Sequence, residues 1–156
     1  MEFYTISLLN GIVYGLLLFM VSAGLTLAFG MMGILNLAHA SFYMIGAYVV
    51  YVVSSQYNFW LGLFVAALFV GIVAACIERT MLRRIHAAGH GQELVFTLGL
   101  AFVIEEIVKL IFGDFPVNYG VPAVMKFSAF TIFDTAFPFY RAFIALTALV
   151  MLLLIW

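Results

Sequence analysis

The chain has 156 residues, of which 67% are hydrophobic and 8% are charged, and its mean hydropathy is +1.24. Soluble domains carry about 25% charged residues, so this composition excludes a soluble fold and indicates an integral membrane protein in contact with a lipid bilayer. The net charge of -1 offers no basic surface, and we expect no nucleic-acid partner. The single cysteine, Cys76, excludes a disulfide framework within the chain.

The first apolar stretch covers residues 6–29. A stretch of about 20 apolar residues can cross a hydrocarbon core roughly 30 Å thick, so this stretch predicts a spanning helix. Residues 1–4 lack the basic start of a signal peptide, and the stretch is longer than the apolar part of one. We therefore expect the first segment to remain in the mature protein.

The second apolar stretch covers residues 31–53, and glycines and polar side chains interrupt its first part. Such an interruption predicts a discontinuous second helix or a re-entrant segment. If this segment crosses the membrane fully, the N-terminus lies outside; if it dips in and returns, the N-terminus lies inside.

The third stretch covers residues 59–82 and begins with Trp60, a residue type common at the membrane interface. Arg79, Arg83 and Arg84 lie at its end, and we interpret them as signals that place the following loop in the cytoplasm. A docking role for these arginines has no signal in the sequence.

The fourth stretch, residues 94–112, then returns across the membrane and leads into residues 113–138, where prolines and glycine predict a hairpin or an interfacial loop. The fifth stretch covers residues 138–156 and carries Arg141 near its start. Together the five stretches predict an all-α membrane protein, a polytopic transmembrane helix bundle with a discontinuous second helix.

The interruption in the second stretch places Asn36, His39, Ser41 and Tyr43 together. A broken helix exposes backbone groups that a substrate or water can use, which favours a cavity-lining role. In a purely structural alternative, Asn36 caps the next helix and His39 bonds a neighbouring carbonyl. The remaining histidines lie in the arginine loop, so the sequence offers no set of metal or haem ligands, and we expect no cofactor.

A second polar group lies within the fourth stretch and comprises Glu105, Glu106 and Lys109. Glu105 and Lys109 are spaced i to i+4 and can pair on one helix face. The surplus carboxylate needs a partner on another helix or contact with a watery pathway, so a clamp between helices and a translocation pathway both remain open. No further acids continue across the membrane, which disfavours a proton relay.

Residues 24–48, GLTLAFGMMGILNLAHASFYMIGAY, closely resemble the signature of branched-chain amino acid ABC transporter permeases of the LivH type. Residues 97–101, 105–113 and 137–141 extend the resemblance in the expected order. Ala40 stands where the family commonly has glycine, which weakens any inference of tight backbone packing at that position.

The resemblance implies a permease subunit of an importer for branched-chain amino acids or related small amino acids and amides, in the bacterial inner membrane. It implies a second homologous permease subunit, cytoplasmic ATP-binding subunits and a periplasmic or extracellular substrate-binding protein as partners. ATP hydrolysis would belong to those partners, so the chain is expected to be no enzyme and to have no catalytic residue and no metal. The matching Asn36, Ala38 and His39 would lie near the pathway between the two permeases.

Permeases of this type are longer, so we expect residues 1–156 to be the N-terminal half of one truncated transmembrane permease domain, without the cytoplasmic coupling element. The alternative is an ion-coupled secondary transporter or channel without an ATPase partner, which would be expected to show an internal repeat. A membrane enzyme or haem carrier would need clustered His, Cys or Asp side chains.

Overall fold

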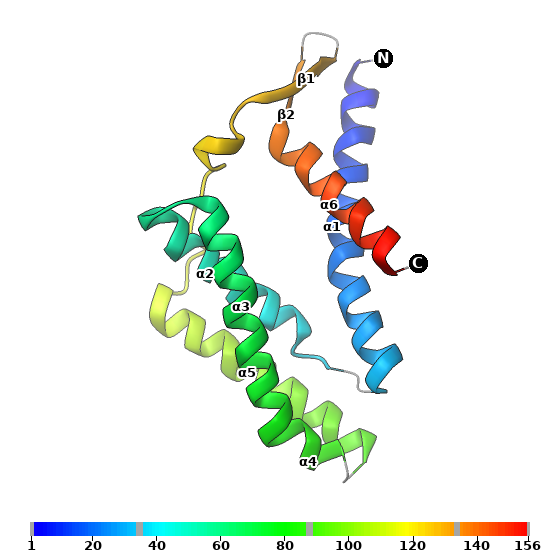
Figure 1. Cartoon of the computed structure of the whole chain (residues 1–156), viewed down its shortest axis with the longest axis vertical. Helices are drawn as coiled ribbons and strands as arrows, with labels where there is room; N and C mark the ends of the chain where they lie inside the picture. Colours follow the sequence, from blue (N-terminus) through cyan, green and yellow to red (C-terminus); the bar gives the residue numbers. More distant parts are fainter. Residues whose placement is uncertain (1, 34–35, 87–88, 133–134, 156) are drawn as a thin grey trace. The chain divides into compact units, whose positions relative to one another are not determined.

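The computed structural model describes residues 2–33, 36–86, 89–132 and 135–155. The order of its elements is shown in Figure 1: α1 (Glu2–Met32), α2 (His39–Gln56), α3 (Phe59–Ile77), a π-helical turn (Glu78–Leu82), α4 (Arg83–His86), α5 (His90–Phe112), a 3-10 turn (Ala123–Met125), β1 (Ser128–Ile132), β2 (Thr135–Pro138) and α6 (Phe139–Ile155). The chain divides into two compact units, one of residues 25–119 and one of residues 1–24 with 120–156.

Within the described residues, two helical segments, Tyr4–Gly30 and Phe59–His86, are long and apolar enough to cross a membrane. Many large apolar side chains on the helices are exposed; Leu110, for example, is 83% exposed. A water-soluble protein rarely leaves such continuous apolar surface uncovered, whereas lipid accepts it.

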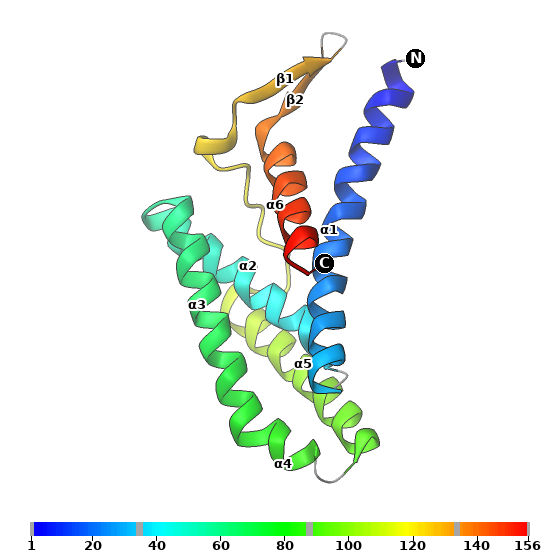
Figure 2. The same cartoon turned by 45° about the vertical axis from the view of Figure 1, so that its right-hand side comes forward.

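The unit of residues 25–119 is built on α2 and α3, which lie side by side and antiparallel (Figure 2). Gly46 lies opposite Val70, and a Cβ atom at Gly62 would lie 3.2 Å from the carbonyl oxygen of Val50. The missing side chain of Gly62 therefore lets the two backbones approach closely, as small residues do between membrane helices.

Helix α5 packs against α2 through a small core in which Phe42 and Ile104 are buried with Ala38. Glycines in the left-handed region flank this helix: Gly89 has a φ of 120° and Gly113 a φ of 89°. The N–H of Gly113 donates to the carbonyl oxygen of Lys109 at 2.7 Å, a typical way to end a helix.

The other unit contains the start of α1, the β hairpin and α6. Strands β1 and β2 are antiparallel, with Thr131 paired to Ala136, which confirms the hairpin alternative predicted for this region. Phe127 stacks on Phe139 at a ring distance of 4.4 Å where the hairpin leads into α6. The guanidinium of Arg141 donates a hydrogen bond to Oδ1 of Asn10, which ties α6 to α1.

Several predicted helix boundaries differ from the structure, by the most at the start of α2. Helix α1 continues to Met32, and the interruption lies between α1 and α2, so α2 itself is one continuous helix from His39 rather than a discontinuous one. Gly33 has a φ of 67° at this interruption, and residues 34–35 lie outside the described part of the chain. Helix α5 starts at His90 rather than at residue 94, because its first turn is too polar to stand out in an apolar pattern.

Candidate functional site

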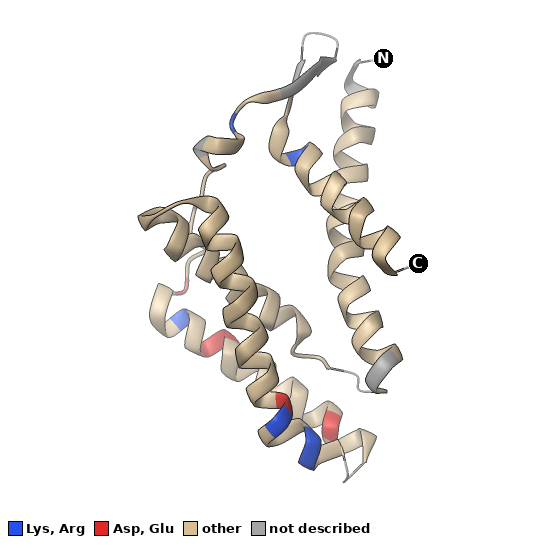
Figure 3. Ribbon diagram, in the orientation of Figure 1, with Lys and Arg blue, Asp and Glu red and all other residues tan. Residues whose placement is uncertain are grey.

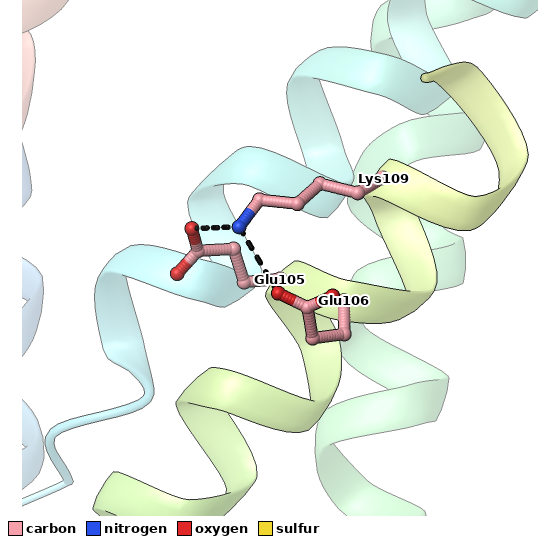
Figure 4. Close-up of polar contacts among 3 residues, drawn as sticks. All are labelled: Glu105, Glu106 and Lys109. Carbon is pink, nitrogen blue, oxygen red and sulfur yellow. Dashed lines mark hydrogen bonds and ion pairs between the residues drawn. The ribbon is translucent and has the colours of Figure 1, made fainter. Parts of the chain in front are cut away.

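The charged residues of the 25–119 unit form two groups, one on the second half of α5 and one at the corner of α3, α4 and α5 (Figure 3). In the first group, Nζ of Lys109 lies 2.8 Å from Oε1 of Glu105 and 3.0 Å from Oε1 of Glu106 (Figure 4). The predicted pairing of Glu105 with Lys109 is therefore confirmed. The second partner, Glu106, was missed, although its i to i+3 spacing is a signal for it.

This triad of Glu105, Glu106 and Lys109 keeps a formal charge of one negative unit. Its side chains are partly exposed, at 47%, 68% and 37% respectively. At a rise of about 1.5 Å per residue, Glu105 lies roughly 22 Å from the start of α5. If α5 crosses the membrane as the sequence predicts, ionised groups in its interior would not face lipid, and this face of α5 would meet water or another protein surface.

A cavity of about 330 Å³ lies beside the triad, between α2 and the end of α5. We call it the α2–α5 cavity. Its lining comprises Ala40, Ser41, Met44, Tyr48, Glu105, Val108, Lys109, Gly113, Asp114, Phe115 and Pro116. A mostly apolar wall with a few converging polar groups is typical of a small-molecule site. The structure thus brings Ser41 of the first predicted polar group together with Glu105 and Lys109 of the second.

Asn36 has a local role in the turn before α2. Its Oδ1 accepts a hydrogen bond from the N–H of Ala38 at 3.0 Å, and its carbonyl oxygen accepts from the N–H of His39 at 3.2 Å. The N-cap residue of α2 is Ala38 and the cap has no side-chain hydrogen bond, so Asn36 stabilises the turn before α2 and does not cap the helix as the alternative predicted. Asn36 also lines a second cavity of about 90 Å³, together with Glu78 and residues from α1, α2 and α3.

The other members of the first polar group lie apart from the triad. Ala38 is fully buried in the core, His39 is half-buried, and Tyr43 is 60% exposed. None of these three residues lines either of the two cavities described above. The first predicted group is therefore spread over two places in the structure.

Glu93 is a buried carboxylate that the sequence did not single out. Its side chain is only 2% exposed, its Oε2 lies 3.4 Å from Nδ1 of His86, and within the described part of the chain its Oε1 has no hydrogen-bond partner. The contact joins the short α4 to the first turn of α5. It was missed because residue 93 fell outside the predicted helix.

An aromatic group holds the segment after α5 against the end of α2. The hydroxyl groups of Tyr119 and Ser54 lie 2.6 Å apart, and the Tyr119 ring meets the Tyr51 ring edge-on at 5.5 Å. Phe112 packs on Tyr48 at 4.4 Å. These contacts join residues far apart in the sequence, so no local pattern signals them.

Comparison with known proteins gives a family and several relatives. The family model described as "Branched-chain amino acid transport system / permease component" matches residues 7–156. The high-affinity branched-chain amino acid transport system permease protein LivH of Escherichia coli is 28% identical over 117 residues, a match that covers 67% of this chain and 37% of LivH. LivH of Salmonella typhimurium is 29% identical with the same coverage. The permease protein BraD of Pseudomonas aeruginosa is 26% identical over 117 residues, which covers 69% of this chain and 38% of BraD.

No solved structure matches the chain at a significant level. The matched segment spans well under half the length of the curated relatives. The family match, the long apolar helices and the dominance of helix in the described residues confirm the prediction of an all-α membrane helix bundle. The resemblance noted from residues 24–48 is likewise confirmed: the chain belongs to the branched-chain amino acid transport system permease family.

Proposed function

We propose that the chain is a permease subunit of an ABC importer for branched-chain amino acids or related small amino acids and amides, and that it forms part of the substrate pathway. The observation that carries the importer proposal is the family match over residues 7–156. The triad of Glu105, Glu106 and Lys109, partly exposed beside the α2–α5 cavity, supports a place in the substrate pathway. An apolar membrane helix keeps such a group only where water, substrate or a partner meets it.

The proposed topology is multi-pass, in the bacterial inner membrane, with the N-terminus outside. The antiparallel packing of α2 and α3 supports a full crossing by the second segment. Ala28, near the end of α1, shares a cavity with Glu78 and Leu82, which supports a topology with the end of α1 on the same side as the arginine-rich corner. Because arginines mark the cytoplasmic side, α1 would enter the membrane from outside.

The proposed assembly contains a second homologous permease, cytoplasmic ATP-binding subunits and a periplasmic or extracellular substrate-binding protein. We propose that ATP binding and hydrolysis in the partners reorient the permease pair around a central pathway, by alternating access. In this mechanism the chain supplies a pathway and no bond-breaking chemistry, so it is no enzyme and needs no cofactor.

Within the pathway, the proposed residues play different parts. Ser41, Glu105 and Lys109 line the α2–α5 cavity. Glu106 forms a second ion pair with Lys109 and adds a negative charge beside it. The remaining proposed residues lie in the turn before α2 and in its first two helical turns: Asn36, Ala38, His39 and Tyr43.

The test is ATP-dependent uptake of labelled leucine by membrane vesicles that contain the chain together with its candidate partner subunits. Lys109→Met, which leaves the two carboxylates without their ammonium, should abolish uptake while the assembly still forms. Val103→Ala, at an exposed apolar position of the same helix, is the matched control and should transport normally. Uptake that needs no ATP-binding subunit would contradict the proposal in favour of a secondary transporter or channel.

A further inference from the structure

We propose that the α2–α5 cavity recognises its ligand through a protonated primary amine, with Glu105 and Asp114 as the acceptors, and not through a carboxylate. This inference rests on the proposed function, because it names the head group that the pathway site selects. A short apolar chain attached to the amine would lie against the apolar part of the wall.

Among the residues that the structure describes, Lys109 is the only cationic side chain in the lining, and its ammonium is already paired with two carboxylates. Its ammonium lies 2.8 Å from one carboxylate and 3.0 Å from another, on neighbouring turns of the same helix. An ammonium group has three donors, and two of them serve these contacts. A ligand carboxylate would have to compete with two resident carboxylates for this one cation.

The negative charge of the site is in surplus. The triad keeps one negative unit, and the exposed Asp114, which also lines the cavity, takes part in no ion pair among the residues that the structure describes. The cavity therefore presents more acceptors than cations. The surplus negative charge attracts a cation and repels an anion, and the partial exposure of these side chains to solvent weakens both effects without changing their sign.

The rest of the lining suits a short apolar chain. Met44, Val108 and the ring of Tyr48 contribute apolar surface, and the volume of about 330 Å³ is within the range of small-molecule sites. A neutral amide or urea would find acceptors here but would not neutralise the surplus charge. The site thus favours an ammonium compound over a neutral one of the same shape.

The position of Asp114 depends on the segment that follows α5. Gly113 ends the helix with a positive φ, and Tyr119 holds the other end of the segment through its hydroxyl contact with Ser54 and its ring contact with Tyr51. These contacts hold both ends of the segment that carries Asp114.

The test uses the full chain in lipid nanodiscs and four probes with one branched carbon skeleton: leucine, 3-methylbutylamine, 4-methylpentanoate and 4-methylpentanamide. Binding is measured by calorimetry or ligand-observed NMR. We expect the amine and leucine to bind and the carboxylate and amide to bind at least about tenfold more weakly, the ratio expected for one charged hydrogen bond. Equal binding of amine and amide, or preferred binding of the carboxylate, would overturn the inference.

Variants test the assignment of residues. Asp114→Asn should weaken amine binding about tenfold, whereas Glu78→Gln, which removes a carboxylate that lines the other cavity, should leave it unchanged. Replacing both triad carboxylates, Glu105→Gln with Glu106→Gln, should free Lys109 and reverse the preference toward 4-methylpentanoate. Wild-type amine binding in Asp114→Asn, or no reversal in the double variant, would count against the proposal.

The transport measurement separates this inference from the proposed function. ATP-dependent leucine uptake without amine binding would leave the importer standing and remove the head-group assignment. Amine binding without ATP-dependent uptake in the presence of the partner subunits would keep the site and refute the importer.

Discussion

Phe42→Ala tests whether the small core between α2 and α5 holds the site in place. Phe42 is 7% exposed and packs with Ala38 and Ile104, directly beside the cavity-lining Ser41 and Glu105. In lipid the transfer of a phenyl ring from water contributes little to helix association, so the loss comes from packing. The removed volume of roughly 100 Å³, at about 24 cal/mol per Å³ of residual cavity, corresponds to about 2 kcal/mol if the helices do not collapse.

The assay is reversible unfolding in mixed detergent and SDS micelles, followed by far-UV circular dichroism. Phe64→Ala on α3 is the matched control, because the same ring is 69% exposed there and its removal should change the free energy of unfolding by less than about 0.5 kcal/mol. Equal losses of unfolding free energy in Phe42→Ala and Phe64→Ala would refute the assignment of Phe42 to a packed core. A loss confined to Phe42→Ala should be accompanied by weaker ligand binding in the α2–α5 cavity.

Three further changes test local contacts by the same unfolding assay. Asn36→Ala should lower the free energy of unfolding by about 1 kcal/mol, because it removes the side-chain acceptor in the turn before α2. Asn36→Asp keeps an acceptor, so its loss of stability should be smaller. The hydroxyl contact is tested by Tyr119→Phe and Ser54→Ala, each of which should lower the free energy of unfolding by about 1 kcal/mol or less. Both variants should also speed hydrogen exchange in the segment after α5. Additive losses of stability in the double variant would show that the two hydroxyls do not interact. Arg141→Met and Asn10→Ala should show a coupling energy of about 1–2 kcal/mol in a double-mutant cycle, and a coupling near zero would contradict the bond between α6 and α1.

Apolar length was sufficient to find the helices, because a bilayer requires continuous apolar stretches whatever the tertiary fold. Apolar length did not predict where the helices begin and end. The boundary between α1 and α2 depends on a positive φ at Gly33, and the first turn of α5 is polar although Glu93 is buried. Both depend on backbone geometry and packing that an apolar pattern does not contain.

The candidate site likewise contains one part that could be predicted from the sequence and one that could not. The pairing of Glu105 with Lys109 follows from helical spacing alone and was predicted, since both residues belong to one helix. The contribution of Asp114 and the hydroxyl contact of Tyr119 with Ser54 depend on how the segment after α5 folds back on α2. The sequence separates these residues widely, so only the three-dimensional structure brings them together.

Cysteine accessibility along α5 tests most directly whether the face with Glu105 and Lys109 borders a watery substrate pathway. Single cysteines at positions 105, 109 and 103 would be introduced in a Cys76→Ser background in the assembled transporter, and labelled with a water-soluble thiol reagent. We expect positions 105 and 109 to react and position 103, on an exposed apolar part of the helix, to stay unlabelled. Positions 105 and 109 as unreactive as position 103 would show that this face of α5 is closed to water and would contradict its role in translocation.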